Sequence, residues 1–570
     1  MTGKQSDLTL RMPGRLFEEL STGGSSADAL AFLERGERAR RLLLLRTLLD
    51  RLGTLPTPLD TPADAWRTVK AAADRAPGPV DRLLLAPQTG GWLGHVLRRL
   101  HGSAAGGPPL WAEAGHLCAL AVAAALRAGT DADLKVPLLD GALVLPSLGL
   151  ARLPGAPRGP SVGRADVRGG ELTLTSEAVD GPPVVVRRPT AVLVGTAGAV
   201  PDIDPHWTPL RVLTLPRPSG TASVTLDDLD PYRDLDDPLA PARLQAAEAT
   251  AWQRLFEEAA LIVSAGGTNG PGRLDAADIR AVVPWGRTTA LPEAPPTVRL
   301  SASSGDSYAA MVVARPAGAL ALAETLVHEF QHSKLAALLH LFPLLDDDRE
   351  ERYYAPWRGD PRHLTGLLHG AYAFTGVAGF WRDRLAEARR PEEAEVAGYH
   401  FALRRTQSRL VVRTLLTSGR PTVQGRAFAA GLARTLDGWL REPVPATALA
   451  RARTAAALHR TEWRLRNVLP RPVSPASPDM PALRTDRTSW PDHRTYAFAA
   501  PPAVPRTADE YLAAGDPAGA LTRYGDVLTA DSAEPHALAG WIVARAALEP
   551  GRAGRRMLAR PELLQPLPGG

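Results

Sequence analysis

Apolar positions recur every three or four residues through most of residues 15–130, which is the spacing of an amphipathic helix. The repeat is clear in "RLFEEL", "SADALAFLERGERARRLLLLRTLLDRL" and "LCALAVAAALRAG". Ser26 or Asp28 stands where the second of these stretches begins, and both residue types are common N-caps. The pattern therefore predicts a helical N-terminal region over residues 1–130.

The period of the pattern changes near residue 135. The next stretches are short, rich in Val, Leu and Thr, and bounded by Gly, Pro and Asp, which are strand signals: "KVPLLDGALVLPSLGLARL", "RGGELTLTSE", "PPVVVRR", "TAVLVG" and "LRVLTL". "SVTLDDLDPYRDL" predicts a further strand and a turn, and "TVRLSAS" and "AAMVVAR" predict a strand pair. Residues 242–266 return to helical spacing, with Gly266 and Gly267 at the end. Residues 131–315 are thus expected to form a mixed α/β segment with a central sheet.

Helical spacing dominates again from residue 317 to residue 468, so we expect a helical core over residues 316–469. Residues 470–506 are rich in proline, which predicts a linker or an extended strap. In residues 507–570, the small and aromatic positions resemble one tetratricopeptide helix pair. A single pair cannot bury its own apolar face, so it is expected to dock on the main body. The whole pattern predicts a mostly helical α+β chain.

Composition and charge narrow the classes of function. The chain has 570 residues, 45% of them apolar, and a net charge of only +5. Almost all its positive charge is arginine, and the basic residues are interleaved with acidic ones. Nucleic-acid binding normally requires a clustered basic face, so this composition does not imply a nucleic-acid partner.

The cysteine content, the first residues of the chain and the length of its apolar runs indicate where the protein is located. Cys118 lies in an apolar run and is expected to be a small buried hydrophobe, and one cysteine excludes an internal disulfide framework. The first residues lack the apolar core of a signal peptide, and we see no uninterrupted apolar run of about 18 residues. We therefore expect a cytoplasmic protein without a membrane span.

One motif carries chemistry. "TLVHEFQHSKLAALLH" contains His-Glu-x-x-His, with His328 and His332 four residues apart. On a helix the two imidazoles share one face and can reach a single metal ion about 2 Å away. The surrounding stretch between Pro316 and Pro343 is helical in pattern, which favours metal binding over a chance match or a pair of structural histidines.

A metal site needs at least one more protein ligand, and the residues leave three options. The metalloproteases with a third histidine six residues after the second have no counterpart here, because position 338 is Leu. His340 lies just over two helical turns beyond His332, too far along the axis to join the pair. Glu350 and Glu351 offer carboxylates but belong to a charge run that is typical of a solvated loop.

His369 is the favoured third ligand. It lies in "HLTGLLHGAYAFTGVAGFW", a small-residue, apolar helical setting. The preceding turn contains Arg358 and Arg362, whose planar guanidinium groups suit carboxylate binding. The alternative for either arginine is that it only pairs with Asp360 to fix the turn.

The two blocks "AETLVHEFQHSKLAALLHL" and "YYAPWRGDPRHLTGLLHGAYAFTGVAGFW" resemble the HExxH-motif family of peptide-modification proteins. Members of that family accompany radical SAM maturases in gene clusters for ribosomally made, post-translationally modified peptides. "VPLLDGALVLPSLGLARL" and "VTLDDLDPYRDL" are also similar, so the resemblance spans roughly residues 85–440. One departure is His363, where the family's segment would have proline.

The resemblance implies an Fe(II)- and α-ketoglutarate-dependent β-hydroxylase of a precursor peptide, with O2 as the oxidant. His328, His332 and His369 would be the iron ligands, and Arg358 and Arg362 would match the family's "PWRxDPR" segment. One of these arginines would anchor the far carboxylate of α-ketoglutarate. Glu329 matches the motif glutamate, a candidate catalytic residue whose role the resemblance does not fix.

Two other readings remain open from the residues. In a zinc metallopeptidase, Glu329 would be the general base that activates a zinc-bound water. In a non-catalytic scaffold, the helical ends would bind a precursor peptide or a maturase around a structural metal. Because this chain has no cysteine triad, any radical SAM maturase in its pathway must be a separate protein.

Overall fold

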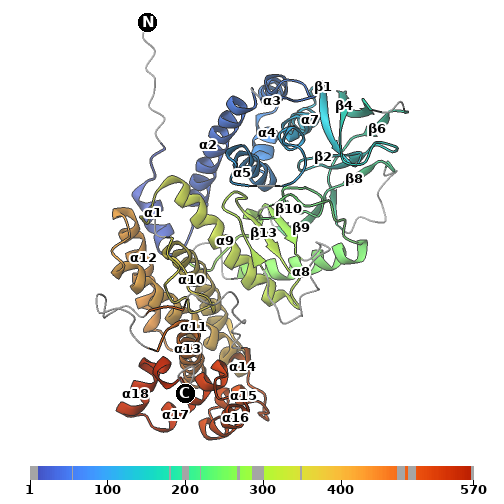
Figure 1. Ribbon diagram of the computed structural model, residues 1–570. Coiled ribbons are helices and arrows are strands. Elements are labelled where there is room, and N and C mark those ends of the chain that lie inside the picture. Colours follow the sequence, from blue (N-terminus) through green and yellow to red (C-terminus); the bar gives the residue numbers. More distant parts are fainter. Residues whose placement is uncertain are drawn as a thin grey trace. The chain divides into compact units, whose positions relative to one another are not determined.

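The computed structural model describes residues 10–53, 55–104, 106–178, 181–194, 204–217, 220–235, 237–265, 270–285, 301–346, 349–470, 482–484 and 496–565. Contacts divide the chain into two compact units. Unit 1 comprises Met1–Met12, Ala27–Thr268 and Leu274–Leu341, and unit 2 comprises Pro13–Ser26, Asn269–Arg273 and Phe342–Gly570. Helices fill the N- and C-terminal regions and strands fill the centre of the sequence (Figure 1), which confirms the predicted mixed α/β class. The five predicted segment boundaries remain a prediction.

Unit 1 holds both sheets. Its helices are α2 (Ala27–Leu52), α3 (Pro62–Arg75), α4 (Pro77–Leu84), α5 (Pro87–His101), α6 (Leu110–Ala114), α7 (His116–Ala128), α8 (Ala246–Ala265) and α9 (Ala319–Leu341). The first sheet has the order β6-β5-β4-β1-β2-β3-β8. Its strands are β1 (Ala132–Leu139), β2 (Ala142–Leu145), β3 (Gly149–Arg152), β4 (Pro160–Arg168), β5 (Glu171–Ser176), β6 (Val184–Arg187) and β8 (Trp207–Pro209).

The apolar run that contains Cys118 forms the centre of the first core. Residues 116–125 are buried on every side, because α7 packs on β1, β2 and β4 while α3 and α4 cover it (Figure 1). Gly129 ends the helix with a positive φ of 66°, a conformation that glycine adopts without steric cost. Burial raises the pKa of the Cys118 thiol to about 12, so it is protonated, as expected of a buried small hydrophobe.

The second sheet supports the helix that carries the histidine motif. Its order is β12-β13-β11-β10-β9-β7. The strands are β7 (Val192–Leu193), β9 (Arg211–Arg217), β10 (Gly220–Leu226), β11 (Ala281–Pro284), β12 (Ser301–Ala302) and β13 (Ala310–Val313). α9 packs on β12 and β13 and also contacts α2 and α8. Leu322, Leu326, Leu335 and Leu338 are buried, so the apolar stripe read from the sequence is the core face of α9.

Unit 2 is helical. Its helices are α1 (Gly14–Ser21), α10 (Leu364–Glu387), α11 (Pro391–Thr417), α12 (Val423–Leu440), α13 (Ala446–Asn467), α14 (Tyr496–Ala499), α15 (Ala508–Ala513), α16 (Pro517–Ala530), α17 (Pro535–Leu548) and α18 (Arg552–Ala559). Leu512, Tyr524 and Ile542 of the tail share one apolar core with Tyr399 of α11 and Leu458 of α13. The tail therefore docks on the body of its unit, as predicted.

Some sequence predictions fall outside the described residues. These are Gly266 and Gly267 at the end of α8, the first part of "TVRLSAS", and most of the proline-rich segment 470–506. Within the described residues, one helical stretch, Leu110–Ala128, is long and apolar enough to cross a membrane. Of its most apolar window, 72% is buried inside the protein, as expected of a core helix.

Candidate functional site

His328 and His332 meet on one face of α9. Their Nε2 atoms lie 3.1 Å apart, and the ring centroids are 4.8 Å apart with the ring planes at 78°. Both residues are half-buried. The four-residue spacing on an unbroken helix brings the two nitrogens together, as predicted.

The 3.1 Å distance between the two Nε2 atoms fits two arrangements, a shared metal ion or a direct hydrogen bond. Two nitrogens that each lie about 2.0–2.1 Å from one metal ion are separated by about 3 Å, so the pair fits a shared cation. The same distance fits a hydrogen bond in which one neutral imidazole donates to the other. Among the described residues no group of three or more His, Cys, Asp or Glu side chains stands in metal-binding arrangement. The geometry therefore supplies two candidate ligands of one ion.

Glu329 is held away from bulk water. Glu329 is buried, with only 1% of its surface exposed. Its Oε1 atom accepts a hydrogen bond of 2.7 Å from the Ser301 hydroxyl of β12. Its Oε2 atom is buried without a hydrogen-bond partner in the described part of the chain. Because Glu329 follows His328 directly, its side chain projects about 100° further around the helix. The carboxylate thus ties α9 to the edge strand of the second sheet.

Two polar contacts after the motif fix α9 within unit 1. The Ser333 hydroxyl accepts a 3.3 Å hydrogen bond from the backbone N–H of Ala309, next to β13. The Nδ1 atom of His340 lies 2.8 Å from Oε1 of Glu37 on α2. His340 is therefore engaged with a carboxylate of α2, in accordance with its exclusion from the pair.

His369 lies in unit 2, on α10, and is half-buried. The next residue, Gly370, allows a close approach of the indole of Trp357: a Cβ atom at position 370 would lie 2.1 Å from Cζ2 of that ring. Trp357 also packs against Phe374, with ring centroids 4.8 Å apart. The glycine beside His369 thus seats the loop that carries the candidate arginines.

Both arginines bind the same carboxylate. Nε of Arg358 donates to Asp360 over 2.7 Å, and Nη1 of Arg362 lies 3.4 Å from the other oxygen of Asp360. Burial raises the pKa of Asp360, but the hydrogen bond from Arg358 and the two positive charges outweigh it and hold that pKa below its ordinary value. The turn-fixing role considered from the sequence is therefore present. The cluster of Arg358, Arg362 and Asp360 carries one net positive charge, from two guanidinium groups against one carboxylate.

The arginine loop is fastened at several points within unit 2. Gln407 donates to the carbonyl of Pro356 over 2.7 Å, and Asn467 donates to the carbonyl of Gly359 over 2.9 Å. His363, at the position where proline was expected, is the N-cap of α10, and its Nδ1 atom accepts from the N–H of Gly366 at 3.1 Å. Histidine thus performs a capping role that proline cannot, and it still starts the helix at the expected place.

The six predicted residues fall into two groups. His328, Glu329 and His332 belong to unit 1, and His369, Arg358 and Arg362 belong to unit 2. A joint site for all six remains a prediction of the sequence. Sequence reasoning missed Ser301, the partner of Glu329, because a serine 28 positions away carries no local signal.

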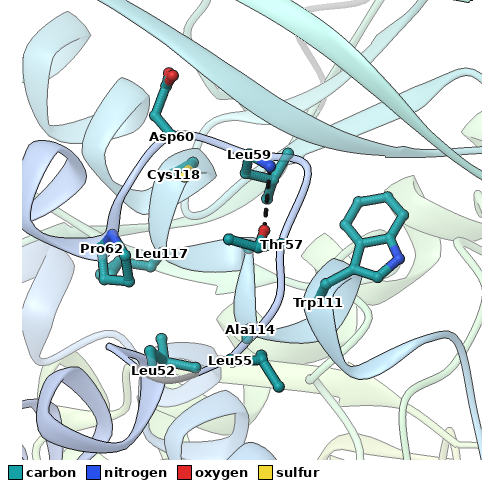
Figure 2. A pocket seen from close by; sticks show the side chains of 11 residues that line it. Leu52, Leu55, Thr57, Leu59, Asp60, Pro62, Trp111, Ala114, Leu117 and Cys118 are labelled. Carbon is teal, nitrogen blue, oxygen red and sulfur yellow. Dashed lines mark hydrogen bonds between the residues drawn. The ribbon is translucent and has the colours of Figure 1, made fainter.

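A hollow in unit 1 has Cys118 in its wall. It is lined by Leu52, Leu55, Leu117 and Trp111, among others, and Figure 2 shows it with the hydrogen bond from the N–H of Leu59 to the Thr57 hydroxyl. Its walls are mostly apolar and its thiol is protonated, so we assign it no chemistry.

Comparison with known proteins adds no family. No family model matches the chain, and no curated protein is similar to it.

Proposed function

We propose that the chain is an Fe(II)- and α-ketoglutarate-dependent oxygenase that hydroxylates a β-carbon of a ribosomally made peptide. The observation that carries this proposal is the 3.1 Å approach of the Nε2 atoms of His328 and His332 on one helix. Two histidines and a third ligand leave coordination positions of iron open for cosubstrate and oxygen, as in non-haem iron oxygenases. His369 is proposed as the third ligand on the strength of the resemblance alone.

The residues of the chain would bind and orient the reactants. His328 and His332 would bind the metal as neutral imidazoles, through the two Nε2 atoms that lie 3.1 Å apart. The net positive charge of the cluster of Arg358, Arg362 and Asp360 would attract the far carboxylate of α-ketoglutarate. When bound, the iron would supply oxidation of the peptide C–H bond to an alcohol, with α-ketoglutarate and O2 converted to succinate and CO2.

Of the two arginines, Arg358 is the better proposed anchor. Its side chain is 51% exposed and reaches Asp360 through Nε, whereas that of Arg362 is 28% exposed. In addition, the backbone of Arg362 is bonded to Tyr353 in both directions at 2.9 Å. A guanidinium whose terminal nitrogens face solvent can form the two parallel bonds that a carboxylate prefers.

The second candidate is a zinc metallopeptidase, favoured by the position of Glu329 inside the His-Glu-x-x-His spacing. A general base must lie within hydrogen-bond reach of the water that it activates. The burial of Glu329 and its bond to Ser301 weigh against that role, and we assign Glu329 the role of fixing α9 to β12.

A co-expression experiment separates the two candidates. The oxygenase should add one oxygen atom to the precursor peptide in the mass spectrum, and the purified chain should release succinate from α-ketoglutarate. A cut peptide whose formation stops in Glu329→Gln would contradict this proposal and support the peptidase.

The remaining assignments follow from the same proposal. We propose a precursor peptide as substrate, a separate radical SAM maturase as pathway partner, and a cytoplasmic location, with no nucleic-acid or membrane partner. Residues 316–469 would form the metal-binding core, and residues 507–570 would be a tetratricopeptide-like unit.

A further inference from the structure

A second hollow in unit 1 has the composition of a ligand site. It has a volume of about 90 Å³, opens to solvent, and lies between the start of α7, the β1–β2 hairpin and the loop after β10. None of its lining residues belongs to α9 or to unit 2. It is therefore built from other residues than the proposed metal site.

The hollow exists because two neighbouring strands separate. β1 and β2 pair only at Leu139 and Ala142, after which β1 continues on β4 and β2 on β3. On the side of β1 that faces away from β4, the N–H of Lys135 is taken by Asp60 at 2.7 Å, and Pro137 has no N–H. Where β1 and β2 diverge, an apolar gap takes the place of further hydrogen bonds between them. Leu138, Leu143 and Val144 line this gap.

The polar end of the hollow has no net charge. Glu113 lines it, but Arg99 lies 2.8 Å from one oxygen of this carboxylate and His95 lies 3.1 Å from the other. Arg99 is further engaged by the carbonyls of Gly106 and Pro108. The guanidinium group of Arg99 is thus already bound by groups of the protein itself.

Two neutral polar side chains line the same end. Burial lowers the pKa of His116 to about 3 and raises that of Tyr232 well above its ordinary value, so the imidazole is uncharged and the phenol keeps its proton. Nε2 of His116 and the hydroxyl of Tyr232 make no hydrogen bond within the described ranges. The two rings contact each other edge to face, with centroids 5.1 Å apart.

The loop after β10 holds Tyr232 rigidly. Asp227 accepts from the N–H groups of Leu229 and Asp230 at 3.1 and 2.9 Å, and Asp230 accepts from the N–H of Tyr232 at 2.9 Å. The carboxyl groups of Asp227 and Asp230 are both buried, an arrangement that costs free energy unless they are bonded. The "DDLDPYRD" stretch singled out in the sequence therefore positions a phenol at the rim of an apolar hollow.

We propose that this hollow binds a small uncharged molecule with an apolar body and one alcohol or carbonyl oxygen, which accepts a hydrogen bond from Tyr232. The apolar gap would bury the body of the ligand, as in most small-molecule sites. A carboxylate or ammonium group is disfavoured, because the described residues that line the hollow include no free charge of opposite sign and an unpaired buried charge is costly.

Calorimetry on the full chain with benzyl alcohol and benzoate tests this site. The two probes share a ring and differ in charge. We expect saturable binding of benzyl alcohol, and binding of benzoate at least tenfold weaker. Tyr232→Phe should weaken benzyl alcohol binding about fivefold, the effect of one hydrogen bond. Tyr511→Phe, the same change in α15 outside the hollow, should leave binding as in the native protein.

A second variant tests whether the probe binds in this hollow or elsewhere on the surface. Ala112→Leu in α6 fills the hollow with a good helix former and should abolish binding. Binding that survives both Tyr232→Phe and Ala112→Leu unchanged, equal binding of benzoate, or no binding of benzyl alcohol would overturn the proposal. His328→Ala should bind benzyl alcohol normally, so the result is independent of the proposed metal.

Discussion

Single residues whose charge is buried give the sharpest predictions, and Asp230 is the first. Burial, together with the neighbouring charge of Asp227, raises the pKa of Asp230 to about 8. The folded chain therefore holds this proton more tightly than the unfolded chain does. The stabilisation is fully present below about pH 4, the unfolded value, and is lost as the pH rises through 8.

Asp230→Asn should consequently stabilise the protein at high pH. The amide keeps an oxygen for the N–H of Tyr232 but carries no charge. We expect a gain of about 1–3 kcal/mol in the free energy of unfolding above pH 8, shrinking towards pH 5. Thermal unfolding at several pH values measures it. Asp237→Asn, at an exposed position of the same loop, is the control, and a pH-independent difference for Asp230→Asn would refute the explanation.

In His536 the fold favours the charged form instead of the neutral one. Its Nδ1 atom lies 2.8 Å from Glu462 and its Nε2 atom 3.0 Å from Asp509, so both nitrogens must carry protons. These hydrogen bonds to Asp509 and Glu462 raise the pKa of His536 to about 10. The stabilisation is fully present below about pH 6.5 and is lost as the pH rises through 10.

His536→Gln should lower the stability of the tail at pH 7 by about 1–2 kcal/mol, because at most one of the two charged hydrogen bonds survives and the side chain is partly exposed. The difference from the native protein should narrow between pH 8 and pH 10. Hydrogen exchange of α17 follows it, with His101→Gln at an exposed helix end as control. A difference that stays constant with pH would show that His536 is not the titrating group.

At the scale of residues, the sequence predicted what depends on local spacing. The His328 and His332 contact follows from helical geometry alone, and it was found. The pairing of Glu329 with Ser301, and of Glu113 with His95 and Arg99, depends on which strands and helices become neighbours. No periodicity in a single sequence encodes those partners.

Among the elements, α10 and the loop before it are in close contact at Gly370. Gly370→Ala would place a methyl group against the indole of Trp357, which must move. We expect a loss of about 1–3 kcal/mol in the free energy of unfolding, the usual cost of overpacking. The displacement should also alter tryptophan fluorescence and loosen the Arg358 loop.

Gly438→Ala in α12 is the matched control, because nothing lies within 4 Å of its added methyl group. This change should stabilise the helix by about 0.5–1 kcal/mol. If Gly370→Ala were as well tolerated as Gly438→Ala, the indole would not be seated on the glycine in the way described.

The sequence predicted the elements better than their pairing. Strand alternation and glycine-bounded turns predicted β1, β2, β3, β5, β6, β9, β10 and β13, and helical spacing predicted α7, α8 and α9, whereas β4, β8 and β11 were not predicted. The early separation of β1 from β2 could not be predicted. A period of two residues shows which face of a strand is buried, but not which strand it pairs with or in which register. The hollow that this separation creates was therefore not predicted.

On the scale of the whole molecule, the chain forms two units with separate cores, that of unit 1 between helices and a sheet and that of unit 2 between helices. The histidine pair belongs to unit 1, and the predicted third ligand and arginines belong to unit 2. The proposed oxygenase therefore requires residues from both units. Sequence patterns describe each unit well but carry no information on how distant segments combine into one site.

Metal analysis of the protein purified without oxygen and reconstituted with Fe(II) tests the central claim, that His328 and His332 hold iron, most directly. We predict close to one iron per chain in the native protein and in His340→Gln, a histidine of the same helix engaged by Glu37. His328→Ala and His332→Ala should each retain almost none while unfolding at a similar temperature. Iron retained by both alanine variants, or a native chain that binds zinc but no iron, would contradict the account.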